Sequence, residues 1–322
     1  ALIFFINNEE SATKTSHEQQ WGKPSAQECA TCIENLLIFC EEYFIYKSEY
    51  QLDMNLREFY VKNVQLSEDE IVNLSCETVK QSSSNSWFQA RRLRISASSN
   101  VHNIKVLCRK PVETLVSNML HRSKIDSTST RYGLKMETYA KEKYQKINNC
   151  IVKRVGVLVC KYQPWLCASL DGVVIDDGCI SKIVEFKFSN VKYLEFINNK
   201  LELKKTDAYY TQVQVQMYVC GMSVCDLFVF SPVEDGSCSI EVHRDEEFLK
   251  AVILKSEKFY FEQYLPALFE ILTTANINKE NTSNNDENTD NLDQAVELVT
   301  RREPFLSRSA CFSLPTILPN QE

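Results

Sequence analysis

Residues 180–188 constrain the fold of this chain more than any other segment, because charged and apolar side chains alternate along them. Side chains on a β-strand point alternately to opposite faces. Val184, Phe186 and Phe188 would therefore face a core, while Glu185 and Lys187 would lie side by side on the other face. The pattern predicts a strand that is buried on one face and carries a carboxylate and a lysine on the other.

A second carboxylate precedes this strand, in the run Ser169-Leu170-Asp171-Gly172. Gly172 permits a tight turn, and a hairpin-like return of the chain would bring Asp171 next to Glu185. Two carboxylates and a lysine suit phosphodiester hydrolysis, because hard oxygen ligands bind Mg²⁺ and the metal activates water and stabilises developing charge. The lysine would orient or help to deprotonate that water, or stabilise the charge itself. Taken singly, Glu-x-Lys is more typical of a solvated strand face and Asp-Gly of a turn.

Two predicted helices offer further polar groups to the same site. Glu137 opens a helix predicted over 133–147 and could project toward the metal. In a helix predicted over 207–220, Tyr209, Gln212 and Gln216 share one face. The three Gln residues between 212 and 216 need polar partners if they are buried. The plainer alternatives are that Glu137 is a surface acid and that the Gln-rich edge faces solvent.

A basic and hydroxyl-rich segment lies between residues 87 and 99. Three arginines are followed by Ser96-Ala97-Ser98-Ser99, a run able to cap a new helix. A helix N-terminus with hydroxyls and nearby guanidinium groups is suited to binding phosphate. The alternative is an ordinary basic helix followed by a capped one.

The remaining pattern predicts an α/β fold with a mixed sheet, since helices and strands alternate along the chain. Apolar spacing predicts a helix over 25–46, and the capping-box pattern Ser67-Glu68-Asp69-Glu70 opens a second over about 68–81. Pieces of helix are predicted over 87–122, and a long helix from residue 245 to about 264. We expect Pro266 to end or kink that last helix. Further predicted strands cover 151–160, 165–169, 172–176, 224–231 and 237–243. Residues 81–86 are predicted to be a polar loop, and the Asn-rich residues 275–294 to be disordered.

Composition neither supports nor excludes a nucleic-acid substrate. The net charge is −7, but residues 276–297 alone carry six acids and one lysine. The 13 cysteines are scattered, and Cys160, Cys220 and Cys225 lie in apolar surroundings, so we interpret them as small buried residues in a reducing compartment. Cys29-x-x-Cys32 has no second pair at zinc spacing. No apolar run is long enough to span a membrane.

From Trp87 to Pro266 the chain resembles the YqaJ-like viral recombinase and lambda-type exonuclease family of the PD-(D/E)XK nuclease superfamily. Five motifs in order carry the resemblance: Trp87-x3-Arg91-x6-Ser98, Gly133-x3-Glu137, Ser169-x-Asp171-Gly172, Glu185-x-Lys187 and Tyr209-x2-Gln212-x-Gln214. The chain departs from the family at Leu170, where Pro is frequent, and at Phe188-Ser189, where Cys-Pro is common. Neither departure touches a predicted metal ligand.

The resemblance implies a restriction-endonuclease-like core, a central mixed sheet flanked by helices, over residues 86–272. A helical extension over 1–85 would precede it, and a largely disordered tail over 273–322 would follow. The resemblance also implies Mg²⁺, with Mn²⁺ as a substitute. The ligands would be Asp171, Glu185, the backbone carbonyl of Phe186, and Glu137 from the helix.

The resemblance assigns the remaining site residues as well. Lys187 would position or activate the attacking water, and Tyr209 and Gln212 would line the site. Arg91 and Ser98 would bind the 5′ phosphate of a double-stranded DNA end, which implies 5′-to-3′ exonuclease activity in recombination, repair, or viral or mobile-element DNA processing. A PD-(D/E)XK endonuclease and an inactive DNA-binding or scaffold domain are the alternatives.

The resemblance also bears on partners and location. Phage members of the family form ring-shaped trimers and work with a single-strand annealing protein, so a homotrimer and such a partner are expected here, and no membrane. The DNA substrate favours an intracellular location, with the nucleus as one candidate.

Overall fold

The computed structural model describes residues 50–107, 111–121, 128–176, 179–188, 192–197, 200–233 and 236–281. The helix predicted over 25–46, with Cys29 and Cys32, lies outside them. Contacts divide the chain into two units, residues 1–270 and 271–322. The architecture below is that of the first unit.

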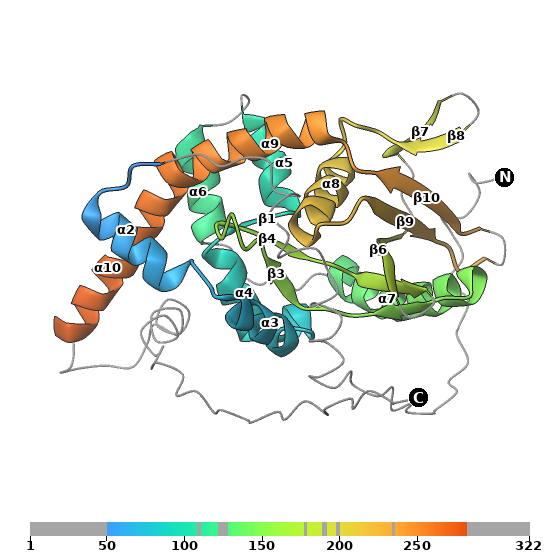
Figure 1. Ribbon diagram of the computed structural model, residues 1–322, viewed down its shortest axis with the longest axis horizontal. Coiled ribbons are helices and arrows are strands. Elements are labelled where there is room, and N and C mark those ends of the chain that lie inside the picture. The colour runs from blue at the N-terminus through green and yellow to red at the C-terminus, as the bar shows by residue number, and fades with distance from the viewer. Residues whose placement is uncertain are drawn as a thin grey trace, which may run out of the picture. The chain divides into compact units, whose positions relative to one another are not determined.

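A five-stranded mixed sheet forms the centre of the fold, in the order β10-β9-β6-β5-β2 (Figure 1). Its strands are β2 (Ile151–Lys153), β5 (Gly172–Asp176), β6 (Cys179–Phe188), β9 (Val224–Phe230) and β10 (Cys238–His243). Strands β6 and β9 are parallel, and the other neighbours are antiparallel. The predicted α/β class with a central mixed sheet flanked by helices is confirmed.

Two smaller sheets accompany the central one. The first has the order β1-β4-β3, from β1 (Ile95–Ser96), β3 (Val157–Val159) and β4 (Leu166–Ser169). The second is a hairpin of β7 (Leu194–Ile197) and β8 (Lys200–Leu203), which the sequence did not predict. Hairpin strands of four residues each leave too short a pattern to recognise.

The prediction of one strand over 151–160 is wrong, because β2 and β3 belong to different sheets. The chain turns away from the central sheet at Gly156, whose amide donates to Ser75 Oγ at 3.2 Å. A Cβ at Gly156 would lie 2.2 Å from Ser75 O and from Thr78 Oγ1. This close approach to an earlier helix breaks the strand, and no local pattern announces it.

Helices cover both faces of the central sheet (Figure 1). Helix α7 (Thr128–Asn148) packs its Ala140 and Tyr144 against Val184 and Phe186 of β6, in one buried apolar cluster. Burial of each large side chain of this kind contributes roughly 1.5–3 kcal/mol. The predicted core face of β6 is thereby confirmed. Helix α8 (Ala208–Cys220) lies over the other face and ends at Gly221, whose φ of 68° is left-handed.

The first of the described helices before the central sheet was not predicted from the sequence, and the others lie within one or two turns of their predicted places. These helices are α2 (Met54–Asn63), α3 (Glu68–Glu77), α4 (Asn85–Arg92), α5 (Ser99–Lys105) and α6 (Val112–Leu120). A capping box between Ser67 and Glu70 opens α3, as predicted. The polar loop predicted over 81–86 is wrong in part, since a 3₁₀ turn covers Gln81–Ser83 and α4 begins at Asn85.

A buried arginine ties this helical region to the sheets. Arg94 is 1% exposed and donates to three backbone carbonyls: from Nη1 to Ala90 at 2.9 Å, from Nη2 to Val64 at 2.7 Å and from Nε to Pro164 at 2.9 Å. A buried guanidinium group needs such acceptors, because burial without them would be costly. Arg94 therefore holds the chain near residues 64, 90 and 164 together.

The C-terminal helices depart from prediction in two ways. Helix α9 (Glu246–Phe259) runs into a π-helical turn (Tyr260–Tyr264) and then into α10 (Leu265–Asn281). Pro266 therefore does not end the helix, and the wider π turn precedes the residue that lacks an N–H group. The disorder predicted from residue 275 is wrong up to Asn281, which is still helical, and residues 282–294 lie outside the described part.

Two smaller predictions can also be checked. Cys160, Cys220 and Cys225 are buried free thiols, as expected. In the described part of the chain, no helix combines the length and apolar character that crossing a membrane requires.

Candidate active site

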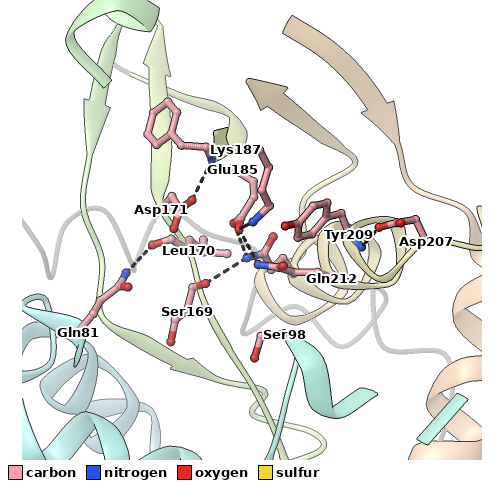
Figure 2. Close-up of polar contacts among 12 residues, drawn as sticks. Gln81, Ser98, Ser169, Leu170, Asp171, Glu185, Lys187, Asp207, Tyr209 and Gln212 are labelled. Atoms are coloured by element: carbon pink, nitrogen blue, oxygen red, sulfur yellow. Dashed lines mark hydrogen bonds and ion pairs between the residues drawn. The ribbon is translucent and has the colours of Figure 1, made fainter. Parts of the chain in front are cut away.

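The hairpin of β5 and β6 brings Asp171 to the middle of β6, as its sequence predicted. Asp171 directly precedes β5, and its Oδ2 accepts a hydrogen bond from the Phe186 amide at 2.8 Å (Figure 2). Gly172 has a different role from the predicted turn. It pairs with Val184 inside the sheet, and a Cβ there would lie 2.3 Å from Val152 Cγ1. Close packing between strands, rather than a turn, requires glycine at this position.

Glu185 lies on the face of β6 that α8 covers, and it is only 3% exposed. Its Oε1 is 2.5 Å from Lys187 Nζ and accepts from Gln212 Nε2 at 2.6 Å (Figure 2). Its Oε2 accepts from Gln216 Nε2 at 2.8 Å. The Gln-rich face of α8 therefore does not face solvent but binds a buried carboxylate, which meets the need of buried amides for partners.

Aromatic rings close the same site beside Lys187. The Lys187 Nζ lies 4.4 Å from the centroid of the Tyr209 ring, a cation–π distance. Tyr193 packs edge-to-face on Tyr209, with 4.8 Å between centroids. Asp207 caps α8 by accepting from the Tyr209 amide at 2.9 Å, which fixes the start of the helix and the ring it carries.

The electrostatics of this group are dominated by two carboxylates in a poorly solvated place. Burial and the neighbouring Glu185 carboxylate raise the pKa of Asp171 well above its ordinary value. Burial lowers the pKa of Lys187, but the carboxylates of Glu185 and Asp171 outweigh it, and the pKa is raised. Lys187 therefore holds its proton at neutral pH, which favours a role in orientation or charge stabilisation over removal of a proton from water.

Glu137 lies near this group but has a partner of its own. Its Oε1 forms an ion pair with Nη2 of Arg154, which follows β2. Burial raises the pKa of Glu137, Arg154 lowers it, and the Glu185 carboxylate raises it further, so that the pKa is raised overall. The Glu137 carboxylate in turn contributes to the raised pKa of Asp171. Within the described residues, no group of three or more acidic, His or Cys side chains is arranged to hold a metal ion.

The donor set nevertheless fits a hard divalent cation. Two carboxylates converge here with little solvent, and burial together with their mutual repulsion raises the pKa of Asp171. A cation such as Mg²⁺ relieves that repulsion, and it commonly takes only one or two carboxylates while it keeps several waters. Asp171 and Glu185 are the side chains that would hold it.

Arg91 gathers a cluster of hydroxyl groups next to the carboxylates. Its Nη2 donates to Ser98 Oγ at 2.7 Å and to Ser96 Oγ at 3.1 Å, and its Nη1 to Ser169 Oγ at 3.1 Å. The guanidinium group stacks on Trp87, 4.2 Å from the ring centroid. Arg91 and Ser98, proposed from sequence as a pair, are thus in direct contact.

Ser169 connects the two halves of the site. Its hydroxyl accepts from Trp87 Nε1 at 3.0 Å, and its carbonyl accepts from Gln216 Nε2 at 3.1 Å. Because Ser169 stands two residues before Asp171, the Arg91 cluster and the carboxylates are adjacent by chain connection. Neither Ser169 nor Gln216 was assigned a role from the sequence.

A comparison with known protein families gives one match in this region. The model of the YqaJ-like viral recombinase domain matches residues 86–223. This match spans all five motifs on which the resemblance was drawn and agrees with that resemblance over residues 86–223. A search of the curated proteins finds no match.

Several solved structures are similar in part. LHK-Exo, an alkaline exonuclease from Laribacter hongkongensis, is 21% identical, with 61% of this chain and 99% of that chain covered and a TM-score of 0.46. KSHV SOX, solved in an RNA complex, is 12% identical over 74% of this chain and 90% of its own, with a TM-score of 0.40. A phage-related exonuclease from Haemophilus somnus 129PT is 11% identical over 69% and 96%, with a TM-score of 0.34.

Proposed function

We propose that the YqaJ-like viral recombinase domain of this chain is a metal-dependent deoxyribonuclease that digests double-stranded DNA from its 5′ ends. The observation that carries the proposal is the convergence of Asp171, Glu185 and Lys187 at the β5–β6 hairpin. Two carboxylates that repel one another in a buried place suit a divalent cation, and a protonated lysine beside them suits a phosphate substrate.

Each residue has a role in this proposal. Asp171, Glu185 and the Phe186 carbonyl would hold Mg²⁺, with Mn²⁺ as a substitute, and Glu137 would add a carboxylate from α7. When bound, the metal supplies a polarised phosphate and an activated water. Lys187 keeps the proton on Nζ and orients that water or stabilises charge on the phosphate. Gln212 and Gln216 hold the Glu185 carboxylate in place, and Tyr209 shields Lys187 from water.

The Arg91 cluster supports an exonuclease over an endonuclease. A guanidinium group with three serine hydroxyls around it is suited to a phosphate with several free oxygens, because each oxygen can accept a charge-assisted bond. Such a terminal phosphate exists only at a DNA end. We therefore propose that Arg91 and Ser98 bind the 5′ phosphate, and that Ser96 and Ser169 contribute to the same pocket.

The first test compares linear duplex DNA with covalently closed circles in the presence of Mg²⁺, for the unaltered chain and for Asp171→Asn. Asp176→Asn is the matched control, since Asp176 is an exposed acid at the far end of β5. We expect the linear DNA to be degraded, the circles to be spared and only Asp171→Asn to be inactive. Nicked circles would favour the endonuclease alternative. Equal activity in both variants would exclude the proposed metal site.

A second test concerns the DNA end itself. Linear duplexes with and without a 5′ phosphate are digested side by side, and the ratio of initial rates is measured. We expect faster digestion of phosphorylated ends and loss of that preference in Arg91→Ala. If the unaltered chain digests both ends equally, the pocket assignment is wrong while the metal site stands.

If the folded protein cuts no DNA at all, the inactive scaffold alternative is favoured.

The assembly and partners form a separate part of the proposal: a homotrimeric ring that works with a single-strand annealing protein. Light scattering during size-exclusion chromatography measures the first, and a monomeric mass would contradict the ring. A nuclear location, also proposed from the DNA substrate, is tested by microscopy of the tagged chain.

A further inference from the structure

Three basic side chains lie at one edge of the central sheet, next to the candidate metal site. Strand β2 is an edge strand, and its Lys153 pairs with Val173, two residues after Asp171. Arg154 follows directly and binds Glu137. Lys141 stands one helical turn beyond Glu137 on α7, on the same side of that helix. Two elements thus bring the basic groups to the Asp171 end of the hairpin.

The charges of the three basic groups influence one another. Burial lowers the pKa of the half-buried Lys141, and Arg154 and Lys153 lower it further, against the Glu137 carboxylate. The ion pair of Arg154 with Glu137 holds the guanidinium group one helical turn from Lys141. The three cations together would attract an anion such as a phosphate.

The segment that carries Lys153 and Arg154 rests on a fixed support. Two residues beyond Arg154, Gly156 donates to Ser75 Oγ, and the next amide, of Val157, donates to Thr78 Oγ1 at 2.8 Å. Both acceptors belong to the end of α3. An arginine whose backbone is anchored in this way loses less freedom on binding a ligand than one on a loose loop.

We propose that Lys141, Lys153 and Arg154 form a binding site for a backbone phosphate of the DNA substrate, beside the Asp171–Glu185 pair and separate from the Arg91 pocket. The inference rests on the proposed DNA substrate. Arg154 faces Glu137 when no DNA is bound, and its planar guanidinium group can instead take two phosphate oxygens at once. The cluster offsets the repulsion that the site's own carboxylates exert on the DNA backbone.

The test is the salt dependence of duplex binding, measured by fluorescence anisotropy of a 5′-phosphorylated duplex in EDTA, where no cleavage occurs. The variants are Lys141→Gln/Lys153→Gln, and Arg154→Gln combined with Glu137→Gln so that no buried carboxylate loses its partner. Lys146→Gln, an exposed lysine further along α7, is the matched control. Thermal melting of every variant accompanies the binding measurements.

We expect the unaltered chain and Lys146→Gln to bind alike. The double lysine variant should bind duplex DNA about tenfold more weakly. The negative slope of log K against log salt should become shallower by about 0.9, the contribution of one phosphate contact. The Arg154 variant should show the same change. If the melting temperature falls but the slope stays at the control value, the cluster is a structural counter-charge for Glu137 and the proposal is overturned.

The same preparation, given Mg²⁺ and linear DNA, separates this proposal from the proposed function. If the unaltered chain cuts DNA but the variants bind with the same salt dependence as the unaltered chain, the phosphate site is refuted and the nuclease proposal stands. If the unaltered chain neither binds nor cuts duplex DNA, the nuclease proposal fails, and this site falls with it.

Discussion

The two faces of strand β6 carry charged groups in opposite arrangements. On the α7 side, buried Asp226 has two partners: Tyr144 donates its hydroxyl proton to it, and Lys182 Nζ lies 3.0 Å away. On the α8 side, Asp171 and Glu185 share Lys187. The first arrangement has a single buried carboxylate, because the second acid near Lys182, Glu241, is exposed, and it holds α7 to the sheet. The second arrangement places two carboxylates around one lysine away from solvent and so keeps an excess of negative charge there. The comparison teaches that excess charge, rather than buried charge as such, distinguishes the candidate active site.

The largest expected difference between the two faces concerns their lysines. Lys187→Ala should lower the rate of DNA digestion by about three orders of magnitude, because a charge aimed at the reacting phosphate is lost. Lys182→Ala removes a lysine from the same strand and should change the rate only a few-fold. Initial rates at saturating Mg²⁺, at a temperature where both variants are folded, measure this. Comparable losses in both would remove the distinction between the faces.

For stability, the α7 side of the sheet should matter more than the α8 side. Asp226→Ala leaves Lys182 without its buried partner and the Tyr144 hydroxyl without an acceptor, which should reduce the free energy of unfolding by about 3–5 kcal/mol. Glu241 is the control, since it lies 3.6 Å from Lys182 but its side chain is 52% exposed. Glu241→Ala should have an effect of at most about 1 kcal/mol. Urea unfolding gives both values, and equal effects would refute the assigned role of Asp226.

A third prediction uses the raised pKa of Asp171. Its folded-state pKa lies above its ordinary value of 3.8, so the folded state binds the proton more tightly and loses stability as pH rises from about 4. In EDTA at pH 8, Asp171→Asn should therefore melt at a higher temperature than the unaltered chain, and the difference should shrink toward pH 4. Melting curves across this range test it, and a constant difference would contradict the burial argument.

The unaltered chain and Asp171→Asn should also differ in how much Mg²⁺ stabilises them. Mg²⁺ at about a hundred times its dissociation constant should stabilise the unaltered chain by about 2.7 kcal/mol. It should not stabilise Asp171→Asn, which lacks a ligand charge. Equal stabilisation of both would mean that the cation binds elsewhere.

The smallest expected effects separate two glutamines of α8. Gln216 binds Glu185 and the Ser169 carbonyl, so Gln216→Ala should slow digestion about tenfold. Gln214 instead donates to the His243 carbonyl and accepts from the Asp245 amide, both at 2.8 Å. Gln214→Ala should leave the rate unchanged and reduce stability by about 1–3 kcal/mol. If Gln214→Ala slowed digestion and Gln216→Ala did not, the face of α8 assigned to the active site would be the wrong one.

The parts of the site that follow a local rule could be predicted from the sequence. Alternation along residues 180–188 identified both faces of β6, and the hairpin return placed Asp171. What could not be predicted depends on contacts between distant segments. The helical period allowed Gln212 and Gln216 to share a face, but only the packing of α8 on the sheet turns that face toward Glu185 while Gln214 binds the start of α9.

Two features near β2 could not be predicted from the sequence, and the reason is the same for both. Gly156 meets Ser75 and Thr78, about 80 residues earlier in the chain, and so ends a strand that its own apolar pattern would continue. The ion pair of Glu137 with Arg154 likewise joins a helix to a strand end. Neither contact leaves a periodic signal in the sequence, so neither could be inferred from it.

The contacts of Arg94 bear on how much of the chain this fold needs. The family match begins at residue 86, yet Arg94 donates to the carbonyl of Val64, which lies before that boundary. A chain cut at residue 86 would keep every motif of the family and still expose a guanidinium group that the intact protein buries. The segment that the family model matches is thus smaller than the folded unit, and residues before it supply part of that unit's interior.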